Sequence, residues 1–239
     1  MQQQPSGCAV HHLGLIEYTK AWAEQRRLVA ACREDNEARL LLLEHPPTYT
    51  LGARGRQEHL LLGDEALARL GAAVLRTDRG GDVTFHGPGQ LVGYPILDLR
   101  CWGQGPSWYV RSLEAVLIEA LSAFGVAGRR EPGRAGVWAG DAKIAAIGVR
   151  ISRGVTSHGF ALNVDPDLRY FSHIVACGLP DVTVTSMAEV LGRAPEAAAV
   201  VDAVIEAFGH VFGLRMDEAA GRGDHPVALG ERLPAPTAQ

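Results

Sequence analysis

Twelve residues, Arg79 to Gln90, constrain the fold of this chain more than any other segment. They contain four of the chain's 28 glycines, together with a proline, a histidine and an arginine. The middle of the segment, Val83-Thr84-Phe85, has the β-branched and aromatic composition of a strand. Glycine lets backbone approach a ligand closely and adopt positive φ. We therefore predict a short strand between two glycine turns, which carries His86 in the wall of a binding site.

The overall composition is that of an ordinary globular protein. Its 239 residues are enough for one large domain with a buried core. A net charge of −4 and a pI near 6.1 do not indicate a nucleic-acid partner, because such proteins usually present a basic face. No apolar run approaches the roughly 20 residues that span a bilayer, and the first residues lack the pattern of a signal peptide. We expect a cytoplasmic protein with no nucleic-acid or membrane partner.

The cysteines favour neither a disulfide framework nor a zinc site. They are far apart in the sequence and form no CxxC pair: Cys8, Cys32, Cys101 and Cys177. His11 and His12 are adjacent rather than spaced as zinc ligands. We therefore expect no metal and no cofactor.

The pattern of apolar residues predicts an α+β fold. Helical spacing marks residues 19–32, 107–124 and 197–212, and Ser186 with Glu189 forms a capping box for a short helix. Strand-like runs cover residues 40–43, 73–75, 91–99, 136–139, 144–151 and 155–162. Because the strands are clustered and do not alternate strictly with helices, we predict a mixed, largely antiparallel sheet flanked by helices.

Two local features refine this prediction. Pro95 interrupts the strand-like run 91–99, which indicates an edge strand or a bulge. Beyond residue 214 the chain becomes rich in Gly, Ala, Pro and charged residues, a composition with little apolar surface to bury. We therefore predict one folded domain, residues 1–214, followed by a flexible tail, residues 215–239.

Two residues are candidates for covalent and proton-transfer chemistry. Cys177 precedes Gly-Leu-Pro, a turn whose backbone N–H groups could stabilise an oxyanion beside the sulfur. Lys143 is the only lysine after Lys20 in a chain that otherwise uses arginine, and lysine, unlike arginine, can release its proton when desolvated. From the residues alone, Cys177 also fits a buried structural cysteine, and Lys143 a solvated lysine in a turn.

Other polar residues surround these candidates in the sequence. His86 lies between glycine turns and His158 adjoins Gly159 in a strand-like run, so each could line a site or be a core histidine bound to backbone. His45, before two prolines, is expected to be structural. Arg79 could hold a ligand carboxylate or phosphate, or only a neighbouring aspartate.

These segments together resemble the lipoyl(octanoyl) transferase family, which moves an octanoyl group from acyl carrier protein to lipoyl domains. The similarity spans roughly residues 12–212, and its specificity comes from the joint order of the motifs. These are Glu44 to Gly52, Arg79 to Gln90, Gly136 to Gly148, His158 to Asn163, Cys177 to Leu179, and Val182 to Ser186. The resemblance implies an octanoyltransferase catalytic domain in residues 1–214, on a fold similar to the catalytic domain of biotin and lipoate protein ligases.

The resemblance also implies roles for individual residues. Cys177 would carry the acyl group as a thioester, and Lys143 would activate it. The substrate would contact Arg79, Gly80, Gly81, Asp82, Val83, Thr84, Phe85, His86, Ala146, Ile147, Gly148, Gly159, Phe160 and Ala161. The implied donor is octanoyl-acyl carrier protein. The implied acceptors are the lipoyl domains of 2-oxoacid dehydrogenase E2 subunits and the glycine cleavage H protein.

Three other activities fit parts of the sequence. An ATP-dependent lipoate or biotin protein ligase on the same fold needs no nucleophilic cysteine, so an ATP requirement would favour it. A binding module without catalytic activity would hold octanoyl groups without covalent capture, and a thioesterase would admit water to the acyl-cysteine. For docking of an acidic carrier protein, the candidate contacts are Arg54, Arg56, Arg129, Arg130 and Arg134.

Overall fold

The computed structural model describes residues 4–175 and 182–218, and its largest element is a mixed eight-stranded sheet. The strand order is β11 (Arg215–Glu218), β1 (Gly7–Leu15), β2 (Ala38–Glu44), β6 (Gln90–Ile96), β10 (Val155–Asn163), β9 (Ala142–Ser152), β8 (Arg134–Ala139) and β7 (Gly128–Glu131). Strand β1 pairs in parallel with both neighbours, and the remaining pairs are antiparallel. The predicted mixed, largely antiparallel sheet is therefore confirmed.

A second sheet of three strands carries the glycine-flanked segment. Its order is β4 (Ala73–Arg76), β3 (Thr48–Leu51) and β5 (Val83–His86). Strand β5 is the strand predicted from Val83-Thr84-Phe85, and it pairs antiparallel with β3, with His86 opposite Thr48. The sequence did not suggest β3, because it follows directly after two prolines.

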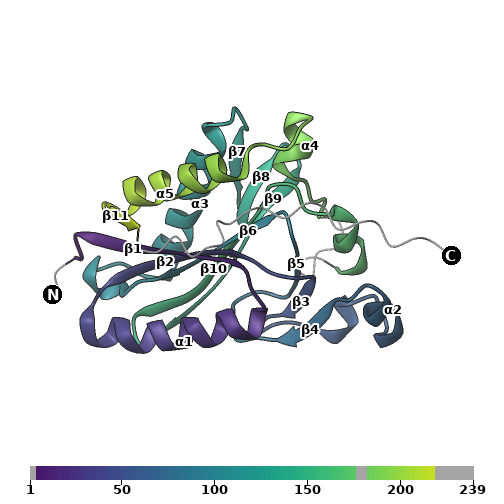
Figure 1. The fold of residues 1–239 in the computed structure, drawn as a ribbon, viewed down its shortest axis with the longest axis horizontal. Helices are drawn as coiled ribbons and strands as arrows, with labels where there is room; N and C mark the ends of the chain where they lie inside the picture. Colours follow the sequence, from purple (N-terminus) through teal and green to yellow (C-terminus); the bar gives the residue numbers. More distant parts are fainter. Residues whose placement is uncertain (1–3, 176–181, 219–239) are drawn as a thin grey trace.

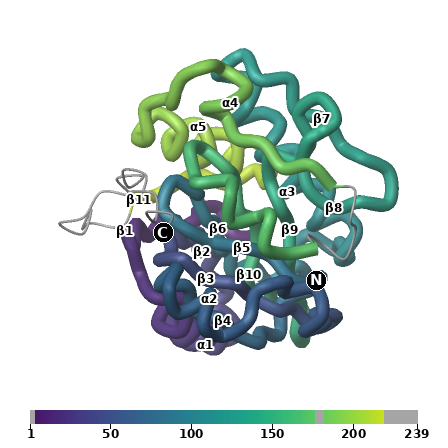
Figure 2. Tube along the Cα trace, turned by 90° about the vertical axis from the view of Figure 1, so that its right-hand side faces the viewer, coloured from purple at the N-terminus to yellow at the C-terminus, as the bar shows by residue number. Residues whose placement is uncertain are grey.

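Helices cover both faces of the large sheet, as Figure 1 shows. Helix α1 (Tyr18–Asp35) lies on one face, and α3 (Pro106–Ser122) and α5 (Ala197–Phe212) lie on the other, an arrangement also visible in Figure 2. Leu41 and Leu43 pack with α1, whereas Leu40 and Leu42 belong to the core under α3 and α5. This explains the unbroken leucine run, because a strand covered on both faces buries every side chain.

Shorter helices connect these layers. They are α2 (Asp64–Arg69), α4 (Met187–Leu191) and three 3-10 turns at Gln57–His59, Leu99–Cys101 and Leu168–His173. The Ser186 side chain accepts a hydrogen bond from the backbone N–H of Glu189 and begins α4, as the capping box predicted. Among the described residues, no helix is long and apolar enough to cross a membrane.

Strand β6 is central rather than an edge strand, so that interpretation of Pro95 is wrong. The strand lies between β2 and β10, and its pairing with β10 runs from Gln90 only as far as Gly93. Beyond Gly93 the regular backbone hydrogen bonds between the two strands stop. There the Thr156 hydroxyl donates to the Pro95 carbonyl (2.8 Å) and accepts from the Leu97 N–H (2.9 Å). Pro95, which lacks an N–H, is thus accommodated where the pairing is interrupted.

The predicted boundary between domain and tail also needs correction. Residues 215–218 form β11, which pairs in parallel with β1 at the end of the large sheet. The folded part of the chain therefore extends beyond residue 214. The rest of the predicted tail, residues 219–239, lies outside the described residues.

Candidate active site

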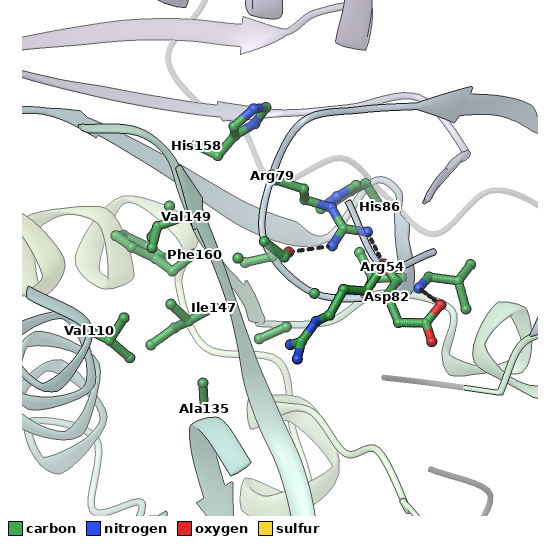
Figure 3. A pocket seen from close by; sticks show the side chains of 18 of the residues that line it. Arg54, Arg79, Asp82, His86, Val110, Ala135, Ile147, Val149, His158 and Phe160 are labelled. Atoms are coloured by element: carbon green, nitrogen blue, oxygen red, sulfur yellow. Dashed lines mark hydrogen bonds between the residues drawn. The ribbon is translucent and has the colours of Figure 1, made fainter. Parts of the chain in front are cut away.

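A cavity of about 660 Å³ lies where β5 and the loop before it meet β9 and β10. Its wall includes Lys143 and every predicted substrate-contacting residue except Phe85. The cavity also borders Tyr18 of α1, Tyr94 of β6 and Val110 of α3. Figure 3 shows Val110, Ile147 and Phe160 on one side of the cavity, with Arg54 and Asp82 on the other. The structure thus brings together three segments that are far apart in the sequence.

Phe85 does not line the cavity, which differs from the substrate contact that the resemblance implies. Successive side chains of a strand point to opposite faces, so Thr84 and His86 share the face toward the cavity. Val83 and Phe85 share the other face and belong to one core cluster, and Val83, at the start of the strand, also borders the cavity. The Phe85 ring stacks on Tyr170 with centroids 4.5 Å apart and lies in the core behind the small sheet.

Arg79 holds the loop that forms one wall of the cavity. Its guanidinium donates to the Thr50 hydroxyl (Nε, 3.1 Å) and to the carbonyl oxygens of Gly80 (3.0 Å) and Asp82 (2.7 Å). The same loop is fixed to β9, because the Gly80 N–H donates to the Val149 carbonyl (2.9 Å). A Cβ atom on Gly80 would lie 2.9 Å from that oxygen, so this close approach favours glycine.

Two buried histidines face the cavity. His158 donates from Nε2 to the Asp78 carboxylate (2.7 Å), and the Tyr18 hydroxyl lies 3.4 Å from its Nδ1. Nδ1 of His86 lies 2.8 Å from the Gln90 side-chain oxygen. Burial, with the Arg79 guanidinium as a further cause, lowers the pKa of both imidazoles, so both are neutral at pH 7.

His45 is buried and hydrogen-bonded at both ring nitrogens, consistent with its expected structural role. Nδ1 lies 2.7 Å from the Ile16 carbonyl oxygen, and Nε2 lies 2.8 Å from the Tyr94 hydroxyl. Burial lowers the His45 pKa to about 4. The hydroxyl of Tyr94, a cavity residue, is therefore held by a neutral imidazole.

The burial of His45 predicts a loss of stability in mild acid. Below pH 6.5 the unfolded chain takes up a proton at this histidine, whereas the native state stays neutral until about pH 4. We expect the free energy of unfolding to fall across this window by about 1.4 kcal/mol per pH unit for such a group. Urea unfolding at a series of pH values measures it. The His45→Gln variant should show a shallower dependence, and an unchanged slope would contradict the prediction.

Lys143 is buried in the cavity wall and is not a solvated turn lysine. The residue is 6% exposed, and Nζ donates to the Ala135 carbonyl (3.2 Å) and lies 5.1 Å from the centre of the Trp138 ring. Its backbone N–H donates to the Thr183 carbonyl (2.8 Å), and its carbonyl accepts from the Thr185 N–H (3.0 Å). Lys143 thus combines a buried ammonium with a direct connection to the segment before α4.

Cys177 lies outside the described residues, 176–181 being one of the gaps. The described residues on either side of that gap are both bonded to the cavity wall. The Val175 N–H donates to the carbonyl of His59 (2.8 Å), and Thr183 accepts from Lys143, as above.

Two buried amides that had no predicted role connect His86 to the segment before α4. The Gln90 side chain, already paired with His86, donates to the Asn163 side-chain oxygen (2.9 Å). Asn163 in turn donates to the Thr185 carbonyl (3.0 Å), and Thr185 is bonded to the backbone of Lys143. The signal for this network was present in the sequence, since Gln90 and Asn163 each end one of the motifs.

The chain matches the family model for the lipoyl protein ligase A/B catalytic domain over residues 17–209, which is most of its length. The chain belongs to this family. It is 52% identical over 209 residues to an octanoyltransferase of Chloroflexus aurantiacus, a match that covers 86% of this chain and 94% of that protein. It is 48% identical over 187 residues to a mitochondrial octanoyltransferase of Arabidopsis thaliana, covering 77% and 80% of the two chains.

The fold of this lipoyl protein ligase A/B family member agrees with solved structures. A crystal structure of lipoate-protein ligase A bound with ATP superimposes with a TM-score of 0.75, covering 97% of this chain and 90% of that one at 14% identity. At such low identity the match concerns the fold alone. It confirms the predicted similarity to the catalytic domain of lipoate protein ligases.

Proposed function

We propose that this protein transfers an octanoyl group from a carrier-protein thioester to a lysine of a lipoyl domain, through an acyl-cysteine at Cys177. The observation that carries the proposal is Lys143, whose buried ammonium lines the cavity while its backbone is bonded to the segment that follows Cys177. Relatives named octanoyltransferase, about half identical over most of both chains, favour this activity over an ATP-dependent ligase.

In the first half-reaction the sulfur of Cys177 attacks the thioester carbonyl as a thiolate. A nearby ammonium stabilises a thiolate, so the first role of Lys143 is to stabilise the thiolate of Cys177. As the tetrahedral intermediate collapses, the carbon–sulfur bond to the donor breaks and Lys143 protonates the departing thiolate. One thioester is exchanged for another, so the free energies of reactants and products are nearly equal. Lys143 is left neutral because it has given up its proton.

In the second half-reaction neutral Lys143 accepts a proton from the lysine amine of the lipoyl domain. The amine attacks the acyl-cysteine carbonyl, and the sulfur leaves as a thiolate. Because an amide is much lower in free energy than a thioester, the reaction requires no ATP. One buried lysine therefore acts first as an acid and then as a base.

The alkyl chain would lie against the apolar side of the cavity. Val110, Ile147 and Phe160 supply that surface and lie together in Figure 3. The proposed partners are octanoyl-acyl carrier protein as donor, and the lipoyl domains of 2-oxoacid dehydrogenase E2 subunits and the glycine cleavage H protein as acceptors. The proposed location is the cytoplasm.

Intact-mass measurement tests the covalent route. After incubation with octanoyl-carrier protein and no ATP, the protein should gain the mass of one octanoyl group, and a lipoyl domain added next should remove it. The Cys177→Ala variant should gain nothing, while Cys101→Ala, which changes a buried cysteine of a 3-10 turn, should behave as wild type. Full transfer by Cys177→Ala, or a requirement for ATP, would count against the proposal.

A further inference from the structure

The cavity wall carries more positive charge than an octanoyl group can account for. In a chain of net charge −4, the lining includes Arg54, Arg56, Arg134 and Lys143. The one acidic side chain in the described lining is Asp82, which is 2.7 Å from His59 and 12% exposed. An acyl thioester is uncharged, so these cations point to an anion elsewhere on the donor.

Ion pairing separates the five arginines that the sequence suggested for docking. Three of them are paired with carboxylates: Arg56 with Glu58, Arg129 with Glu131 and Asp141, and Arg130 with Glu114. In the part of the chain that the structure describes, Arg54 and Arg134 have no carboxylate partner, and both side chains are exposed in the cavity wall. The Arg134 guanidinium lies 5.8 Å from the centre of the Trp138 ring, a contact that does not use its N–H groups. Among the five arginines, these two therefore have N–H groups available for an anion.

The structure fixes both arginines close to the catalytic parts of the cavity. Arg54 follows β3, and its backbone N–H donates to the Gly81 carbonyl (3.1 Å) in the loop held by Arg79. Arg134 begins β8 and directly precedes Ala135, whose carbonyl accepts from Lys143. Figure 3 shows the Arg54 side chain extending away from Asp82, toward the side of the cavity that carries Ile147 and Ala135. Both side chains therefore line the same cavity as Lys143.

We propose that Arg54 and Arg134 bind the phosphate of the phosphopantetheine arm that carries the acyl thioester. This inference rests on the proposed octanoyl transfer, because the free octanoic or lipoic acid used by an ATP-dependent ligase has no such arm. Guanidinium groups bind phosphate oxygens through paired, charge-assisted hydrogen bonds. Their place in the cavity wall fits a ligand that enters the cavity, whereas an acidic face of the carrier protein would remain outside it.

Three donors and four proteins test this assignment. The donors are octanoyl-pantetheine, octanoyl-4′-phosphopantetheine and octanoyl-carrier protein. The proteins are wild type, Arg54→Gln, Arg134→Gln and the double variant. We expect the double variant to raise KM for the two phosphate-containing donors by roughly 10- to 100-fold, the range for hydrogen bonds to charged groups, with kcat unchanged. Its acylation by octanoyl-pantetheine should match wild type.

The control variant is Arg69→Gln, which changes an exposed arginine of α2 that is paired with Glu65, lies outside the cavity wall and should leave all three donors unaffected. Thermal melting confirms that each variant is folded. An equal loss with both small donors would overturn the assignment, since the arginines would then not act on the phosphate. A loss with the carrier protein alone would also overturn it and would indicate contact with an acidic protein surface. If no donor acylates wild type, the proposed transfer fails, and this inference fails with it.

Discussion

Replacement of Lys143 by methionine is expected to slow octanoyl transfer by roughly 10²- to 10⁴-fold, because both proton transfers lose their carrier. Methionine has a similar length and fits irregular buried space, so the variant should remain folded. The Ala135 carbonyl would lose its hydrogen bond from Nζ, which is a modest cost in stability. The other lysine of the chain, Lys20, is exposed on α1, and Lys20→Met is the matched control.

The Lys143→Arg variant separates charge from proton exchange. Arginine keeps a positive charge near the sulfur but does not deprotonate in proteins. Single-turnover experiments should therefore show a larger loss in transfer of the octanoyl group to the lipoyl-domain amine than in formation of the acyl-enzyme. Wild-type rates for both steps in Lys143→Arg would exclude the acid–base role.

A single added methyl group at Gly159 is expected to have the largest effect on stability. A Cβ atom there would overlap the carbonyl oxygen of Gly93 and lie 2.7 Å from Cδ of Pro95. Both neighbours belong to the central strand β6, so relief requires β10 to move away from it. We expect Gly159→Ala to lose more than about 4 kcal/mol of unfolding free energy, or not to fold, as in the severe core mutations.

Gly63→Ala is the control for Gly159→Ala. Gly63 has φ of −81°, precedes α2, and a Cβ atom there would meet nothing within 4 Å. We expect a change of less than about 1 kcal/mol, the usual scale for the residue that caps a helix. Urea unfolding of the two variants beside wild type gives the comparison. A small change in Gly159→Ala would mean that β6 and β10 are not packed as closely as described.

Local patterns in the sequence were sufficient for much of the fold and of the cavity wall. The leucine run 40–43 predicted a buried strand, and its position between two covered faces explains why no polar residue interrupts it. The β-branched and aromatic residues 83–85 predicted β5 between its glycine turns. The order of the motifs identified three wall segments that meet in the structure.

Features that depend on long-range contacts could not be predicted from local sequence patterns. The direction of Phe85 depends on which face of β5 meets Tyr170, more than 80 positions later. Arg79 binds carbonyl oxygens whose positions depend on the conformation of its own loop and of the end of β3. No residue pattern in the sequence predicts that conformation. Pro95 is compatible with a central strand only because Thr156 supplies the missing hydrogen bonds.

The parallel pairing of β11 with β1 has a consequence for synthesis of the protein. β11 is the last of the described strands to leave the ribosome, and its partner β1 is the first. Until β11 emerges, one side of β1 presents unpaired N–H and C=O groups, which other nascent chains could add to. This side of β1 can therefore be paired only after the chain has been translated through Glu218, and until then it is open to wrong pairing between chains.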